Sequence, residues 1–81
     1  MKYSEILKML KELITNNVRK KDIHEHTRLS DLNVDSMTMV ALATEIEVRF
    51  DVIIDPAIIY DLNNIQGIAS YITKELNPEL K

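Results

Sequence analysis

Few side chains in this sequence could do chemistry, and its only histidines, His24 and His26, lie two residues apart in a polar stretch. Two histidines at this spacing make a poor helical metal pair, and a chain without cysteine has no thiolate to complete a tetrahedral site. We interpret both as surface histidines and expect no metal site. A serine nucleophile would need a base and an oxyanion hole, for which so short a chain has little concave space. The sequence therefore predicts a protein without catalytic activity of its own.

A calcium loop is the next possibility, because Asp31, Asn33 and Asp35 match the first three ligand positions of an EF-hand. The sixth position of such a loop should be glycine and is Ser36. The twelfth should be a bidentate glutamate and is Leu42. Calcium binding is therefore not expected.

Ser36 itself follows Asp35 and opens a run that reaches Phe50 without glycine or proline. An Asp-Ser pair before such a run commonly caps a helix, because a side-chain oxygen accepts from an unpaired amide of the first turn. A phosphate esterified to the Ser36 hydroxyl would lie at the positive end of the helix dipole, near unpaired N–H groups. Ser36 is therefore a candidate for helix capping and for attachment of a phosphate-linked group.

The helix expected at residues 36–50 has two apolar stripes. At 100° per residue, one narrow face collects the expected core positions Met39, Leu42, Ala43, Ile46 and Phe50. The opposite face collects Met37, Ala41, Thr44 and Val48. Either the helix is sandwiched inside the domain or its outer stripe is a docking surface.

The first helix is expected at residues 3–17, where apolar residues recur at spacings of three and four. Ser4 is its predicted N-cap and Asn16-Asn17 its predicted end. Residues 18–34 lack sustained periodicity and are expected to form a long loop. Three isolated apolar residues should anchor this loop: Ile23, Leu29 and Leu32.

Two further helices are expected at residues 56–62 and 65–76. Asp55-Pro56 has the chemistry of an N-cap followed by a first helical residue, and Asn64 is the predicted cap of the last helix. Asn77-Pro78 should end it. Before them, the β-branched run at 52–54 is expected to be an extended connector, because no second strand offers itself as a partner.

Composition and length agree with a folded domain. Eighty-one residues leave room for a single domain over 1–81, and 46% hydrophobic with 28% charged residues is ordinary globular composition. The expected fold is all-α, a small bundle of three main helices and one short helix. A net charge of −3 disfavours nucleic acid. No apolar run approaches a membrane span, and no apolar leader follows Met1, so we expect a cytoplasmic protein. We also expect it to be a monomer.

Together these features resemble an acyl carrier protein, the domain that bears 4′-phosphopantetheine on a serine. The resemblance covers nearly the whole chain: the leading helix, the loop with Leu29-Ser-Asp-Leu32, the motif Asp35-Ser36-Met37, Phe50-Asp51 and the stretch from Ile65 to Ile72. It implies that Ser36 is the attachment point for 4′-phosphopantetheine from coenzyme A. It also implies that Asp35 helps a separate phosphopantetheinyl transferase to position its metal and the serine hydroxyl. Met37 stands where the motif usually has leucine.

In this family the exposed part of the second helix is read by partner enzymes, such as ketosynthases or acyltransferases. The resemblance therefore favours docking through the outer stripe, with the nearby acids included: Met37, Ala41, Thr44, Val48, Glu45 and Glu47. Family members can also shelter a cargo chain between their helices. The candidates for such a cavity are aliphatic: Leu42, Ile46, Ile54, Ile59, Ile68 and Ile72.

The implied function is to hold acyl intermediates as thioesters on the phosphopantetheine arm and deliver them to partner enzymes. Asn33 replaces a frequent glycine, which is tolerable because asparagine also adopts left-handed geometry. The second helix lacks the strong acidity typical of fatty acid synthase carriers, and the Gly-Gly-His/Asp-Ser motif of peptidyl carriers is missing. We expect a freestanding carrier of polyketide, fatty-acid-like or other specialised acyl biosynthesis, with a D-alanyl or other aminoacyl carrier as the alternative.

A rival from another class is a helical protein-interaction module without a prosthetic group. In that protein Ser36 would only cap a helix, and the outer stripe would bind a protein partner. Composition does not separate the two classes, whereas covalent loading of Ser36 would.

Overall fold

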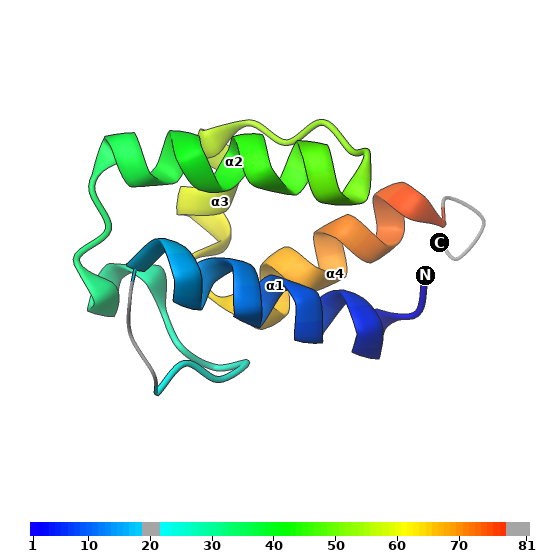
Figure 1. The fold of residues 1–81 in the computed structure, drawn as a ribbon, viewed down its shortest axis with the longest axis horizontal. Helices are drawn as coiled ribbons and strands as arrows, with labels where there is room; N and C mark the ends of the chain where they lie inside the picture. Colours follow the sequence, from blue (N-terminus) through cyan, green and yellow to red (C-terminus); the bar gives the residue numbers. More distant parts are fainter. Residues whose placement is uncertain (19–21, 78–81) are drawn as a thin grey trace.

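The computed structural model describes residues 1–18 and 22–77, and within these ranges the chain is helical with no β-strand. The elements are α1 (Tyr3–Val18), the 3₁₀ helix η1 (Leu29–Leu32), α2 (Ser36–Phe50), α3 (Pro56–Leu62) and α4 (Ile65–Leu76). α1 packs on α4 and α2, and the short α3 bridges α2 and α4 (Figure 1). This arrangement confirms the expected all-α bundle. No helix in the described ranges is long and apolar enough to cross a membrane.

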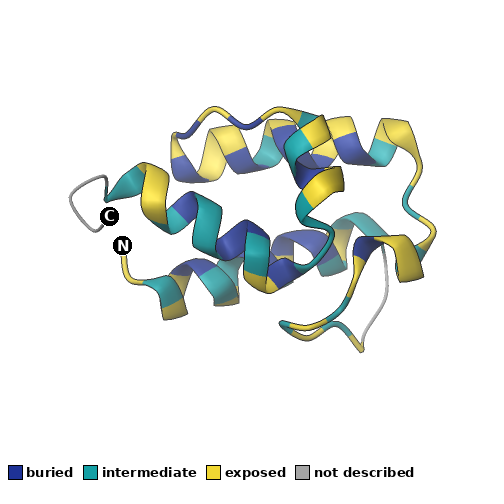
Figure 2. Cartoon of the chain, turned by 180° about the vertical axis from the view of Figure 1, so that it is seen from behind, coloured by how far each residue is buried: buried dark blue, intermediate teal, exposed yellow. Residues whose placement is uncertain are grey.

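The core lies between the inward faces of the four α-helices, where the buried positions of the chain meet (Figure 2). Within the described residues no polar or charged side chain is buried, so aliphatic packing supplies most of the stability. The predicted inner stripe of α2 is confirmed, because every member is buried: Met39, Leu42, Ala43, Ile46 and Phe50.

The predicted N-cap of α1 is wrong. The helix begins at Tyr3, so Ser4 lies inside the first turn and its hydroxyl is not in a capping position. The backbone N–H of Glu5 donates to the carbonyl of Lys2 at 3.1 Å, and the Glu5 carboxylate accepts from the backbone N–H of Lys2 at 3.3 Å. The first turn is therefore closed by a glutamate three residues after Lys2, in the manner of half a capping box.

The predicted end of α1 at Asn16-Asn17 is also too early, because the helix continues to Val18. The Asn17 side-chain amide donates to the carbonyl of Leu13 at 2.8 Å and to Glu45 Oε1 on α2 at 3.1 Å. A contact with a second helix thus occupies the side chain whose local preference suggested a helix end.

Hydrogen bonds tie the long connection between α1 and α2 to the junction of α3 and α4. The N–H of Leu29 donates to the carbonyl of Asn63 at 2.7 Å, and the N–H of Gln66 donates to the carbonyl of Glu25 at 2.9 Å. The Asn63 side chain accepts from the N–H of Ser30 at 3.0 Å and donates to the Ser30 hydroxyl at 3.2 Å. The segment that leads to Ser36 is therefore held in place by residues more than thirty positions away in the sequence.

The expectation of a continuous loop fails at Leu29–Leu32, which forms η1. Residues three apart eclipse in a 3₁₀ helix, so Leu29 and Leu32 turn toward the core together. One such turn is too short to produce a periodic sequence signal. The three predicted anchors are confirmed, since Leu29 is buried and Ile23 and Leu32 pack against the core. Asn33 follows with φ 55°, the left-handed geometry expected of an asparagine there.

The connector between α2 and α3 contains neither helix nor strand. Val52 and Ile54 are buried, whereas Ile53 between them is 86% exposed. Asp51 adopts φ 56° and donates its N–H to the carbonyl of Glu47 at 3.0 Å, which ends α2.

The predicted caps of the last two helices are confirmed. Asp55 accepts from the N–H of Ala57 at 2.8 Å, and Asn64 accepts from the N–H of Gly67 at 2.6 Å. Pro78, which was expected to help end α4, lies outside the described residues. These caps fix the residues at which α3 and α4 start. The position of α3 matters for the site described next, because residues of α3 line it.

Candidate attachment site at the start of α2

Asp35 caps the N-terminus of α2. Its backbone is extended (φ −84°, ψ 174°), and its Oδ1 accepts from the N–H of Thr38 at 2.8 Å. Its own carbonyl accepts the helical hydrogen bond from Met39 at 3.0 Å. The capping role that the sequence left open between Asp35 and Ser36 therefore belongs to Asp35.

Ser36 is the first residue of α2, and it is exposed. Since Asp35 supplies the cap, the Ser36 hydroxyl is not required to pair the amides of the first turn. No hydrogen bond joins this hydroxyl to any other described residue. A phosphate ester on it would lie beside the positive end of a fifteen-residue helix, which suits a phosphate-linked group.

Hydrogen bonds from Thr38 hold the pKa of the Asp35 carboxyl below its ordinary value of 3.8. The backbone N–H of Thr38 has the largest effect and its hydroxyl the next, and both favour the ionised carboxylate. Asp35 is therefore a carboxylate at neutral pH, one residue before the exposed hydroxyl.

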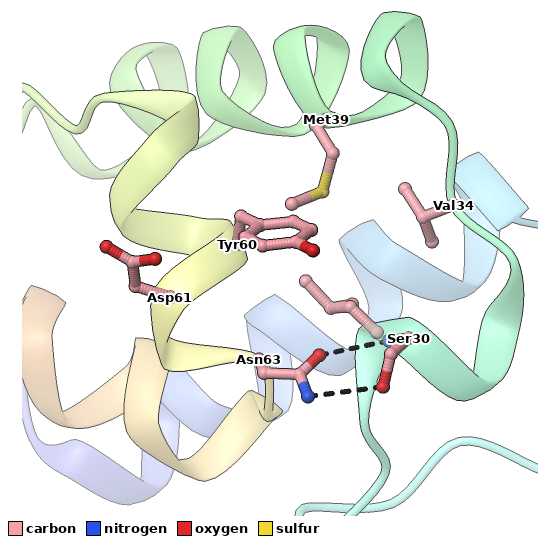
Figure 3. A pocket seen from close by; sticks show the side chains of 7 residues that line it. Ser30, Val34, Met39, Tyr60, Asp61 and Asn63 are labelled. Carbon is pink, nitrogen blue, oxygen red and sulfur yellow. Dashed lines mark hydrogen bonds between the residues drawn. The ribbon is translucent and has the colours of Figure 1, made fainter.

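Two neighbouring surface hollows adjoin this point. The first, of about 290 Å³, includes Ser36 itself together with Val40, Pro56 and Ala57. The second, of about 250 Å³, is lined by Leu29, Ser30, Asp61 and Asn63 (Figure 3). Three further residues line both: Val34, Met39 and Tyr60. Open space next to Ser36 is thus bounded by η1, the start of α2, and α3.

The outer stripe of α2 is exposed, so the helix is not sandwiched inside the bundle. Met37 is 81% exposed and Val48 78% exposed, and Ala41 and Thr44 between them are exposed as well. Val40, which the sequence reasoning missed, is 53% exposed and continues the apolar surface toward the first hollow. Val40 follows Met37 by three residues, and this helical spacing could have identified it as a neighbour of Met37 on the helix surface.

The two glutamates assigned to the docking surface flank this stripe. Glu45 is partly buried, accepts from the Asn17 side chain and lies 3.6 Å from Arg49 Nε. Glu47 is exposed, and its Oε2 accepts from the N–H of Ile54 at 3.4 Å. Both carboxylates have partners within the chain, and the stripe between them is largely apolar.

None of the six residues assigned to a cargo cavity lines either hollow. Each is at most 1% exposed in a closed core: Leu42, Ile46, Ile54, Ile59, Ile68 and Ile72. Helical periodicity identifies the side chains that pack helices together, whereas the hollows lie where η1 and α3 flank the start of α2. For this reason Met39 was predicted only as a core residue, and Val34 and Tyr60 were not recognised from the sequence.

The histidines lie on the surface, as interpreted. His24 and His26 are both exposed, and His24 Nδ1 accepts from the backbone N–H of His26 at 3.2 Å. The segment that holds them is remote in sequence from Ser36, and no hydrogen bond links either ring to the Ser36 hydroxyl in the described part of the chain.

The chain is similar to known proteins over most of its length. A family model described as "Phosphopantetheine attachment site" matches residues 4–72. The chain is 34% identical over 77 residues to an acyl carrier protein of Karelsulcia muelleri, a match that covers 91% of this chain and 93% of that protein. It is also 31% identical over 51 residues to aminoacyl carrier protein 2 of Bradyrhizobium diazoefficiens, covering 63% of this chain but only 57% of that relative.

The chain therefore belongs to the phosphopantetheine-attachment family and is a carrier protein of the acyl carrier type. The prosthetic group of this family is 4′-phosphopantetheine.

The pKa of Asp35 can be measured directly. Because the folded pKa lies below the unfolded value, the hydrogen bond to Thr38 stabilises the fold above the unfolded pKa and ceases to do so as the pH falls through the folded pKa. We expect the Thr38 amide signal in an NMR titration to shift with a midpoint below 3.8. Asp35→Asn should abolish that titration step. A midpoint at or above the ordinary value would contradict the cap.

Proposed function

We propose that this chain carries acyl groups on a 4′-phosphopantetheine arm attached to Ser36 and presents them to enzymes of polyketide, fatty-acid-like or other specialised acyl biosynthesis. The observation that carries the proposal is the exposed Ser36 hydroxyl at the first position of α2, directly after a cap supplied by Asp35. Similarity to an acyl carrier protein over most of the chain supports it. We propose further that the chain catalyses no step itself.

Attachment requires a separate phosphopantetheinyl transferase and coenzyme A. The Ser36 oxygen forms a bond to the phosphorus that bears pantetheine, the diphosphate bond of coenzyme A breaks, and the adenosine bisphosphate leaves. The hydroxyl proton passes to a base of the transferase. The Asp35 carboxylate, ionised at neutral pH and one residue away, is suited to contact the metal that the transferase holds.

The attached arm supplies a terminal thiol that holds the acyl group as a thioester. The protein contributes a fixed anchor for this arm at Ser36 and a surface that partners recognise. Once a partner is docked, the tether makes delivery an intramolecular event with a raised effective concentration.

We propose that the outer stripe of α2 is the docking surface, formed by Met37, Val40, Ala41, Thr44 and Val48 and flanked by Glu45 and Glu47. These residues are on the same helix as Ser36, so a bound partner would lie beside the arm. Because the stripe itself is apolar, docking should depend more on burial of apolar area than on ion pairs. Partner enzymes would accordingly present an apolar patch to α2.

A cargo chain could be sheltered in two ways. It could rest in the hollows beside Ser36, or it could enter the core among the six aliphatic residues assigned from the sequence. The second route requires the helices to separate, because those residues are fully enclosed. The hollows need no such rearrangement, and we propose them as the first resting place of the cargo.

A second candidate cargo is an aminoacyl group, and similarity to a protein named aminoacyl carrier protein 2 is the observation that favours it.

The cytoplasmic location and the monomeric state expected from the sequence stay predictions.

Loading of Ser36 separates a carrier from a protein-interaction module without a prosthetic group. After incubation with coenzyme A, magnesium and a broad-specificity transferase, the native chain should gain one phosphopantetheinyl group by intact mass. Ser36→Ala should gain none, since it lacks the attacking oxygen. Ser4→Ala removes another exposed serine hydroxyl and is the matched control, which should load fully. An unchanged mass for the native chain would favour the rival class.

The docking surface is tested by Met37→Ala. Loss of this exposed side chain from the contact should cost about 1–2 kcal/mol of binding and so lower the transferase kcat/KM roughly 5–30-fold. Ile53→Ala removes an equally exposed apolar side chain from the connector and should leave kcat/KM unchanged. Equal effects of the two variants would contradict a docking role for the stripe.

A further inference from the structure

Tyr60 occupies an unusual position for an exposed aromatic residue, because it lines both hollows beside the attachment site. It is 72% exposed on α3. Figure 3 shows its ring beneath the side chain of Met39, with the hydroxyl directed toward Val34. The ring is thus part of the wall that the two hollows share.

The two hollows differ in chemistry. Apart from Ser36 and Tyr60, the first hollow is lined by apolar side chains only, among them Val40, Pro56 and Ala57. The second hollow adds the polar side chains of Ser30, Asp61 and Asn63. An apolar chain therefore gains from burial in the first hollow and gains less among the polar groups of the second.

Rigid elements position the ring. Asp55 caps the start of α3, and Asn63 ends the helix with φ 59°, donating its N–H to the carbonyl of Ile59 at 3.0 Å. Ile59 is fully buried and anchors the helix, so its neighbour Tyr60 is turned outward. The paired side chains of Asn63 and Ser30 also fix the far wall of the second hollow.

We infer that the ring of Tyr60 determines how long an acyl chain this carrier can shelter. The inference rests on the proposed function, since the chain must be attached through Ser36. An arm anchored at Ser36 can fold back and place its cargo in the first hollow, where the Tyr60 ring blocks passage into the second. A hollow of about 290 Å³ lies at the small end of the range for ligand pockets. The sheltered cargo is therefore a short, apolar acyl group.

The test is a chain-length series on the complete protein. The native chain, Tyr60→Ala and Tyr60→Phe are each loaded with butanoyl, octanoyl and dodecanoyl groups from the acyl-coenzyme A by a broad-specificity transferase. Loading is checked by intact mass, and shelter is measured as the rate of thioester cleavage by hydroxylamine. Methyl NMR shifts report which hollow the chain contacts, because Val40 and Ala57 line only the first hollow and Leu29 lines only the second.

For the native chain we expect cleavage to slow from butanoyl to octanoyl and to change little at dodecanoyl. For Tyr60→Ala, which joins the hollows, cleavage should continue to slow at dodecanoyl, by up to roughly fourfold for each further methylene group buried. Tyr60→Phe keeps the ring and should match the native chain. Ile53 is an exposed apolar residue that lines neither hollow, so Ile53→Ala should also match the native chain.

A plateau at octanoyl in Tyr60→Ala would overturn the inference, and so would cleavage rates that do not depend on chain length in any protein. In both cases a mass gain that depends on Ser36 would leave the carrier function standing. Failure of every protein to load would instead refute the proposed function and the inference with it. The amide NMR spectrum of Tyr60→Ala shows whether this variant folds. If it does not fold, Tyr60→Phe still tests the inference, because loss of the native length limit in a variant that keeps the ring would contradict a role for the ring.

Discussion

The hydrogen bond from the N–H of Thr38 to the carboxylate of Asp35 is the constraint on which the attachment site depends. It fixes the residue at which α2 begins, and the 100° turn per residue then decides where each following side chain points. Ser36 comes first and is exposed, Met37 lies on the outer stripe, and Met39 turns toward the core. One cap therefore sets both the exposure of the hydroxyl and the surface that we propose partners recognise.

A second constraint holds the opposite wall of the site. Asn63, at the junction of α3 and α4, pairs through its backbone and its side chain with Leu29 and Ser30 of η1. This contact keeps the connection before α2 against α3, and the hollows beside Ser36 lie between them. A carrier with a closed aliphatic core can thus offer space next to its proposed attachment point, Ser36, without opening that core.

Features with local causes could be predicted from the sequence. The inner stripe of α2 repeats over about three turns. The caps Asp35, Asp55 and Asn64 act on amides two or three residues away. Features with distant causes could not. The Asn63–Ser30 pair joins residues 33 positions apart, and its existence could not be read from either neighbourhood.

The same reason explains the errors. The hydrogen bond from the Asn17 side chain to Glu45 joins two helices, so it could not be predicted from the residues around Asn17. The hollows were not predicted because they are spaces between elements that no side chain fills. A periodic sequence pattern identifies the side chains that pack in the core, and it does not locate unfilled space. The proposed attachment motif, by contrast, could be identified from the sequence because its residues are adjacent there.

The central claim is that the register set by the Asp35 cap, and not mere exposure on α2, makes one hydroxyl the attachment point. The most direct measurement is the loading rate of the double variant Ser36→Ala/Met37→Ser, which moves the hydroxyl one residue along the helix to a position that is also exposed, with Met37→Ser alone as control. The account predicts that the double variant gains no phosphopantetheinyl group while the single variant still loads. Loading of the double variant at a rate close to that of Met37→Ser alone would contradict it.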